Sequence, residues 1–149
     1  MKLSEHFSLD EFTASQTATR QGIKNTPSAA VVENLRMLAA LLEQIRTLLG
    51  SHSIHISSGY RSLALNRYIG SNDTSAHVRG YAADFTCPAF GKPIEVAKEI
   101  AESNLKFDHI IFESGTNPWV HISCDPQNRR QLLTARFKDG HTYYTTGIA

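Results

Sequence analysis

The sequence contains the stretch Ser75-Ala76-His77-Val78-Arg79-Gly80-Tyr81-Ala82-Ala83-Asp84, in which six residues separate a histidine from an aspartate. Both residue types bind zinc, and a third ligand is available in His121, within Trp119-Val120-His121-Ile122-Ser123. Two histidines and one carboxylate leave the fourth tetrahedral position of a zinc ion open to water, which is the arrangement of a catalytic zinc site. We therefore interpret His77, Asp84 and His121 as metal ligands.

The segments around these residues predict how the fold presents them. Residues 82–87 are typical of a buried strand, which places His77 in the loop before the strand and Asp84 on the strand itself. Residues 119–124 are a second strand, on which His121 faces away from its two apolar neighbours because side chains alternate along a strand. If those neighbours pack in the core, His121 points into a cleft.

The remaining segments predict an α+β fold, with a mainly antiparallel sheet and helices packed on it. A capping box in Ser8-Leu9-Asp10-Glu11 opens a short helix, and Thr13 to Asn25 is expected to be a surface loop. Helices are expected at 27–49, 62–69 and 93–104, and strands at 54–57, 82–87, 107–112, 119–124, 132–138 and 141–146. The last two strands form a hairpin around Asp139-Gly140.

Length and composition set the class of protein. The 149 residues, of which 41% are hydrophobic, are enough for one domain spanning 1–149 with a core of its own. The formal charge of +1 provides no strong field for nucleic acid or an anionic membrane, so neither is expected as a partner. Cys87 and Cys124 do not have the spacing of a thiolate zinc site and are expected to be free thiols. A monomer is the default expectation.

The N-terminal residues Met1-Lys2-Leu3-Ser4-Glu5-His6 have no apolar run of the kind found in signal peptides. No other segment approaches the roughly 18 apolar residues that cross a membrane. We therefore expect a protein that is made in the cytoplasm and has no stable association with a membrane. A substrate outside the membrane would be reached only after release or export.

Arg61 ends the motif Ser58-Gly59-Tyr60-Arg61, which follows the predicted strand at 54–57. One interpretation of Arg61 is a surface charge or a structural ion pair. The other is a clamp beside the metal, because a guanidinium presents fixed donors to a carbonyl or carboxylate oxygen. Both interpretations stay open on the residues alone.

Taken together, Ser-Gly-Tyr-Arg, Ser-x-His-x-x-Gly-x-Ala-x-Asp and Trp-Val-His-Ile-Ser resemble a known family of zinc peptidases. They are similar to motifs of the D-Ala-D-Ala carboxypeptidases and L-alanyl-D-glutamate endopeptidases of the Hedgehog-type fold, which include phage endolysins. The motifs run from Ser57 to Ser123, and the opening Leu3 to Thr17 and the long helix also look like the short, phage-type members. Most of the chain is therefore covered by the resemblance.

The resemblance implies a function for each matching residue. It implies zinc on His77, Asp84 and His121, and cleavage of peptidoglycan stem peptides. Arg61 is similar to the family arginine that orients the substrate carbonyl, and Ser75 is similar to the motif serine at the rim of the site. Zinc would then make hydrolysis of the peptide bond possible, because it lowers the pKa of its bound water toward about 7 and polarises the scissile carbonyl.

The general base is the part of the pattern that departs from the family. Many relatives carry an acid three residues before the last histidine ligand, and this position is Pro118. Glu113, at the end of the strand that pairs with the His121 strand, is the candidate base, with a solvated hairpin charge as the alternative. Asp108 is the second candidate, although its place at the start of a strand favours a turn or capping role. Trp119 is a candidate for substrate contact.

Two functions from different classes follow from these observations. The first is a zinc metallopeptidase that either trims a terminal D-alanine from the stem peptide or cuts inside it. The second is a zinc-stabilised module that binds the cell wall without turnover, which Pro118 makes plausible. A zinc hydrolase with another substrate is a third, weaker hypothesis. By analogy with the family, a small single-domain lysin would reach the wall through a membrane-permeabilising partner such as a holin.

Overall fold

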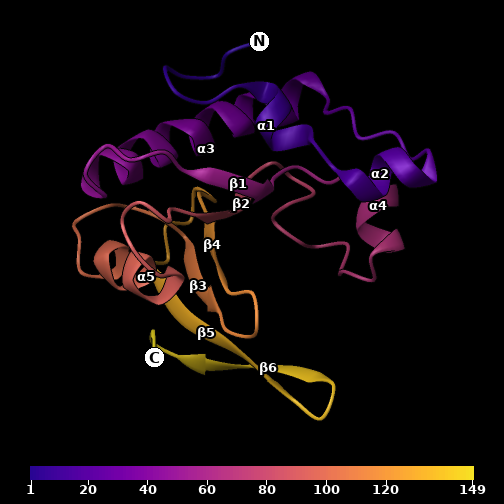
Figure 1. Ribbon diagram of the computed structural model, residues 1–149. Coiled ribbons are helices and arrows are strands. Elements are labelled where there is room, and N and C mark those ends of the chain that lie inside the picture. Colours follow the sequence, from indigo (N-terminus) through magenta and orange to yellow (C-terminus); the bar gives the residue numbers. More distant parts are fainter.

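The computed structural model describes residues 1–149, in which helices cover a six-stranded sheet (Figure 1). The helices are α1 (Leu9–Thr13), α2 (Gln16–Gln21), α3 (Ala29–Leu48), α4 (Leu63–Tyr68) and α5 (Pro93–Ala101). The strands are β1 (His55–Ser58), β2 (Ala82–Thr86), β3 (His109–Glu113), β4 (Trp119–Ser123), β5 (Gln131–Lys138) and β6 (His141–Thr146). The α+β class predicted from the sequence is confirmed.

The strands lie in the order β1-β2-β4-β3-β5-β6, and the sheet is mixed. Four neighbouring pairs are antiparallel, whereas β3 and β5 are parallel. β3 lies between β4 and β5 in the sheet, so the chain passes β3 on its way from β4 to β5 and then runs parallel to β3. The expected antiparallel arrangement therefore holds for only part of the sheet. The predicted hairpins β3–β4 and β5–β6 are both present.

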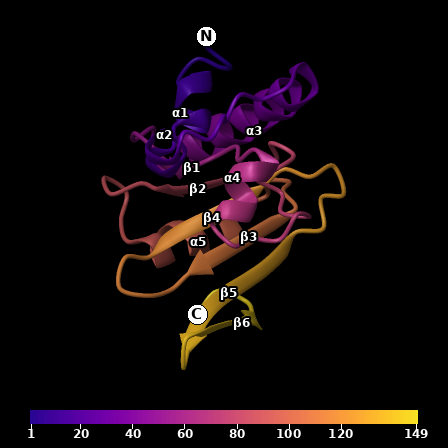
Figure 2. The same ribbon diagram turned by 90° about the vertical axis from the view of Figure 1, so that its right-hand side faces the viewer.

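One face of the sheet forms the core with α3 and α5. Alternate strand residues such as Phe85, Ile110, Val120 and Ile122 are fully buried on this face. The leucine stripe of α3 and the apolar side of α5 belong to the same cluster. Figure 2 shows α5 behind the sheet and α4 in front of it, so different helices lie over the two faces of the sheet. The face turned toward α4 remains available for a site.

The segment from Thr13 to Asn25 contains the helix α2, so the prediction of a loop was wrong there. The Ser15 hydroxyl accepts a hydrogen bond from the backbone N–H of Ala18, which caps the helix, and Gly22 ends it with a left-handed φ of 65°. A helix this short has no apolar stripe that a periodicity could reveal. Instead, Ala18 alone is buried against the rest of the protein.

The other boundaries differ from the predictions by a few residues. The long helix α3 begins at Ala29 with Ser28 as its cap, two residues after the proline that was expected to start it. Phe7 and Phe12, on either side of the capping box, are buried in the core. None of the helices is long and apolar enough to span a membrane.

Candidate metal centre

The structure brings the three predicted ligands together on the open face of the sheet. Asp84 on β2 and His121 on β4 are direct cross-strand partners, and His77 reaches them from the loop before β2. One donor atom from each of the three residues lies within 4.8 Å of the other two. His121 faces away from the fully buried Val120 and Ile122, as the alternation of the strand predicts.

The His77 ring is oriented by the backbone. Its Nδ1 lies 2.7 Å from the carbonyl oxygen of Gly59, which can only accept a hydrogen bond, so Nδ1 carries the proton. The lone pair is therefore on Nε2, which lies 3.5 Å from Oδ1 of Asp84. An imidazole whose second nitrogen donates to a backbone carbonyl is the usual arrangement of a metal-binding histidine.

The distances between the donor atoms fit a zinc ion. Two donors that each lie about 2.0–2.1 Å from a tetrahedral zinc ion are about 3.3 Å apart. Oδ1 of Asp84 lies 3.1 Å from Nδ1 of His121 and 3.5 Å from Nε2 of His77. The set of two imidazoles and one carboxylate is also the donor set of catalytic zinc sites. His77, Asp84 and His121 could therefore hold zinc with little rearrangement.

The charge state of the three residues also suits a cation. Burial by itself would raise the pKa of the Asp84 carboxyl, but His77 and His121 hold this pKa well below its usual range. Burial lowers the pKa of His77, and the Asp84 carboxylate opposes that shift. A charged carboxylate and a neutral imidazole are the forms that bind metals.

Arg61 lies beside the ligands and not on the free surface. Burial lowers the pKa of its guanidinium, and the charge of Asp84 opposes the shift, which places the two groups near each other. The guanidinium Nε is buried without a hydrogen-bond partner in the chain. No ion pair joins Arg61 to an acid within 4.0 Å, whereas the surface arginine Arg67 pairs with Asp73 at 2.8 Å. The geometry thus favours a clamp over a structural ion pair.

The backbone around Arg61 is held by Asn25, which sequence reasoning missed. The Asn25 amide nitrogen donates to the carbonyl oxygens of Thr13 at 2.9 Å and Tyr60 at 3.0 Å. Its amide oxygen accepts from the backbone N–H of Ser62 at 2.7 Å. Asn25 therefore brackets Arg61 on both sides. The sequence carries no signal for this role, because a single asparagine at the end of a polar stretch is ordinary turn composition.

Glu113 lies on the same face of the sheet as the ligands. Ile111, two residues before Glu113, is the direct partner of His121, so Glu113 is its diagonal neighbour across β3 and β4. Glu113 is half-buried. Burial raises the pKa of its carboxyl, the charge of Asp84 adds to the rise, and His121 opposes it.

Asp108, the second candidate base, is already engaged elsewhere. Arg129 donates to its two carboxylate oxygens from Nε and from a terminal nitrogen, both at 2.8 Å, and the Arg129 backbone N–H also donates to it at 3.0 Å. Only 2% of the Asp108 side chain is exposed. This ion pair holds the loop before β5 against the start of β3, which is a structural role.

The remaining candidate residues lie at the edges of the site. The Ser75 hydroxyl accepts a hydrogen bond from the backbone N–H of His77 at 3.3 Å, so Ser75 supports the ligand loop. Trp119 is half-buried on β4 and directly opposite Glu113. Both free cysteines are buried and neither belongs to the site; burial raises the pKa of Cys124 to about 12.

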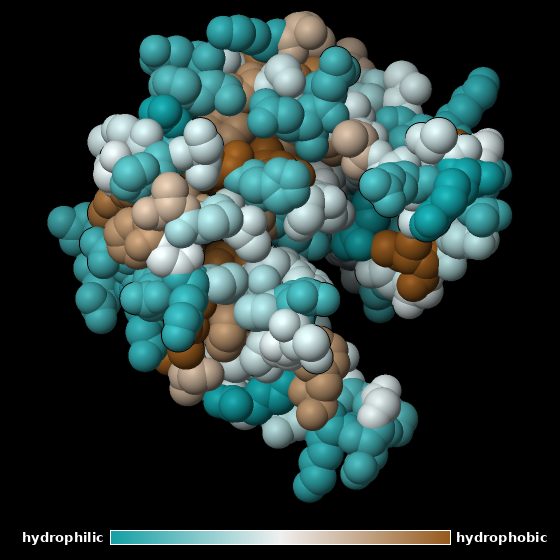
Figure 3. Space-filling model, in the orientation of Figure 1, coloured by the Kyte–Doolittle hydropathy of each residue, from teal (hydrophilic) through white to brown (hydrophobic).

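The surface of the protein is hollowed on the side of α4. Figure 3 shows a deep notch that separates the part formed by α2 and α4 from the β5–β6 hairpin below. On the side of α2 and β1, a groove with a volume of about 840 Å³ includes Arg61 among its lining residues. The ligands on β2 and β4 thus lie between a groove on one side and the hairpin on the other.

Comparison with known proteins places this architecture in a family. A family model described as Peptidase M15 matches residues 5–123. The chain belongs to the peptidase M15 family. The matched residues of this M15 member include the three candidate ligands, Arg61 and Glu113, whereas β5 and β6 follow the matched segment. None of the curated proteins matches the chain.

Proposed function

We propose that this peptidase is a zinc metallopeptidase that hydrolyses peptidoglycan stem peptides. The observation that carries the proposal is the convergence of His77 Nε2, Asp84 Oδ1 and His121 Nδ1 at zinc-like spacing in a member of the M15 family. When bound there, zinc supplies Lewis acidity that lowers the pKa of water and polarises a carbonyl. The peptidoglycan substrate is what the resemblance implies.

The residues of the chain supply the proton transfer and the orientation. Hydrolysis forms a C–O bond from water and breaks the C–N bond, and one proton must pass from the water to the leaving amine. Glu113 takes and returns this proton, because it is a half-buried carboxylate whose raised pKa makes it a better base than an exposed glutamate. Arg61 donates to the substrate carbonyl from the side of β1.

The other features follow from the same resemblance. The chain acts as one zinc peptidase domain with a Hedgehog-type fold, and Ser75 and Trp119 contact the substrate at the rim. It works as a monomer that reaches the wall after release or holin-type export. This is the biology of a phage endolysin, and it is supported by the motifs of the chain.

A zinc-stabilised wall-binding module without turnover is the second candidate function. It is favoured by Pro118, which occupies the position where many relatives carry the acid. The two functions differ in whether the protein cuts what it binds. Glu113 is therefore the residue that an experiment must address.

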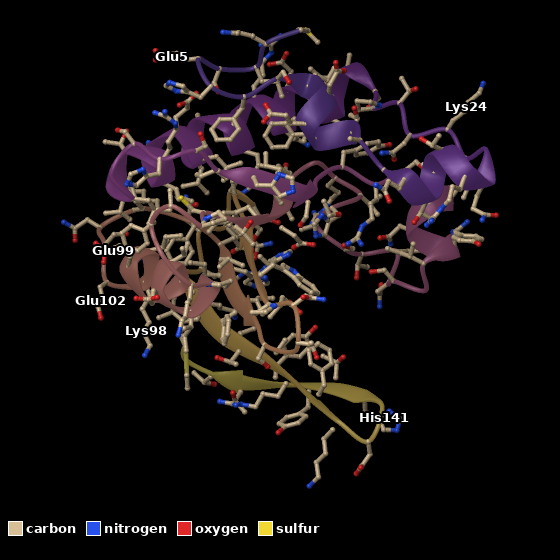
Figure 4. The ribbon with its side chains drawn as sticks, viewed as in Figure 1. Glu5, Lys24, Lys98, Glu99, Glu102 and His141 are labelled. Atoms are coloured by element: carbon tan, nitrogen blue, oxygen red, sulfur yellow. The ribbon has the colours of Figure 1, made fainter.

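The test compares zinc-loaded wild type with Glu113→Gln on purified muropeptides, and identifies the fragments by mass. The variant should keep its zinc and lose about 10²–10⁴-fold in rate, the usual contribution of a general base. Glu102→Gln is the matched control, because Glu102 points outward from the end of α5 (Figure 4) and is exposed. Near wild-type rates in Glu113→Gln would remove Glu113 from the role. Wall binding without fragments in wild type would support the second candidate function.

A further inference from the structure

The β5–β6 hairpin continues the face of the sheet that carries the candidate metal centre. Glu113 on β3 is the direct partner of Ala135 on β5, and Ala135 is in turn the direct partner of Tyr144 on β6. Trp119, opposite Glu113 on β4, extends the row in the other direction. Since side chains of directly paired residues lie on one face, these four residues form one row that begins beside the ligands.

Two large aromatic side chains on this face of the hairpin are exposed. Tyr144 is 56% and Phe137 is 53% exposed. Between Tyr144 and Glu113 lies only the short side chain of Ala135, so the phenol can lean toward the carboxylate. Burial raises the pKa of Tyr144, and the charge of Glu113 adds to the rise, which agrees with this proximity. The Phe137 ring packs near Gly115 in the β3–β4 turn, where an added Cβ would lie 3.6 Å from it.

The hairpin presents no cation on this face. Arg136 pairs with Tyr143, and Lys138 with His141, on the opposite face of the two strands. The Nε of Arg136 donates to the Thr145 hydroxyl on that opposite face. Figure 4 shows His141 at the tip of the hairpin. The turn 114–118 contains no basic residue either.

The position of Glu113 decides which half of a substrate lies over Tyr144 and Phe137. The acid that protonates the leaving amine must lie on the side from which the amine departs. Glu113 is between the ligands and the hairpin, whereas Arg61 and the groove beside β1 are at the other end of the strand order. The leaving half of the peptide therefore runs over the row toward Tyr144, and the acyl half runs toward Arg61.

We propose that Tyr144 and Phe137 form a binding wall for the leaving half of the peptide, and that the protein cuts inside the stem peptide. A peptidase that removes one terminal residue must recognise a free carboxylate next to the scissile bond, for which a fixed cation is the usual partner. The aromatic, cation-free wall instead offers contact area to a chain that continues for two or more residues. This inference rests on the proposed function, because it takes Glu113 as the general acid.

The first experiment identifies the bond that is cut. The N-acetylated stem pentapeptide that ends in D-alanyl-D-alanine is incubated with the zinc-loaded protein, and the products are identified by mass. We expect cleavage at an internal bond, with at least two residues in the leaving fragment. Release of D-alanine alone would overturn the inference.

The second experiment measures binding without turnover. Trp119 is the only tryptophan in the sequence and lies in the row, so its fluorescence reports a peptide in the cleft. In a Glu113→Gln background, Tyr144→Ala should raise the Kd of the pentapeptide about tenfold, the value of one good aromatic contact. Tyr143→Ala is the matched control, because Tyr143 is 45% exposed on the opposite face of the same strand.

The outcomes separate this inference from the proposed function. Equal affinities of the Tyr144→Ala and Tyr143→Ala proteins would overturn the binding wall, as would the absence of any fluorescence change. A wild-type protein that binds the pentapeptide through Tyr144 but never cuts it would contradict the proposed hydrolysis alone. Exposed side chains are changed in both variants, so loss of folding is not expected, and circular dichroism verifies this.

Discussion

Replacing Gly59 with alanine tests how the fold holds the candidate metal centre. A Cβ at Gly59 would lie 2.6 Å from the carbonyl oxygen and 2.8 Å from the Cα of Phe12, which is fully buried in α1. Ordinary contact begins at 3.4 Å, so the Cβ and the oxygen must separate by 0.8 Å (3.4 − 2.6). Because both partners are backbone, no side chain can rotate away to relieve the clash.

The displacement has two costs that can be estimated. The Phe12 carbonyl accepts a hydrogen bond from the Tyr60 N–H at 2.7 Å, and its loss costs about 1 kcal/mol. Overpacking in a filled interior adds about 1–3 kcal/mol. Together the two costs lower the free energy of unfolding by about 2–4 kcal/mol, which lowers the melting temperature by roughly 5–15 °C for a domain of this size. The Gly59 carbonyl also orients His77, and loss of such support weakens metal affinity about 10–100-fold.

The assay combines thermal unfolding, with and without zinc, and zinc affinity from competition with a chromophoric chelator. Gly91→Ala is the matched control, because the nearest atoms to its new Cβ belong to the flexible end of Glu95. We expect the Gly91→Ala protein to resemble wild type in both measurements. A folded Gly59→Ala protein that binds zinc as tightly as wild type would refute the link between α1, the Gly59 carbonyl and the His77 ring.

Two further predictions concern residues that support the site from outside. Asp108→Asn should lower stability at pH 7 by about 2 kcal/mol, since it breaks the charge-assisted hydrogen bonds from Arg129. Those bonds lower the pKa of Asp108 below 3.8. The stability difference between wild type and variant is therefore present above pH 3.8 and should fade in melting curves as the pH falls below it. A difference in stability that persists at pH 2 would contradict this. Asn25→Ala should reduce kcat/KM about tenfold through the loosened Arg61 while zinc affinity changes less than about threefold, and equal losses of both would indicate a general structural role instead.

The sequence was sufficient for those features that depend on local order. Because side chains alternate along a strand, the sequence placed His121 on the other face of the sheet from Val120 and Ile122. The spacing of apolar residues identified the long helix α3. The motif from Ser75 to Asp84 put a loop ligand and a strand ligand in reach of each other, as the structure has them. In contrast, α2 was missed, because six residues with one buried alanine carry no periodic signal.

The surroundings of the candidate metal centre came only from the tertiary structure. Nothing in the segment 131–146 indicates that β5 pairs in parallel with β3, yet this pairing puts Tyr144 in one row with Glu113. Asn25 acquires its role only because the chain returns to it 35 residues later, at Tyr60. The sequence by itself therefore determined which side chains can bind a metal, since spacing and alternation are local properties. The surroundings of the candidate metal centre were decided by contacts between distant segments, which no local pattern encodes.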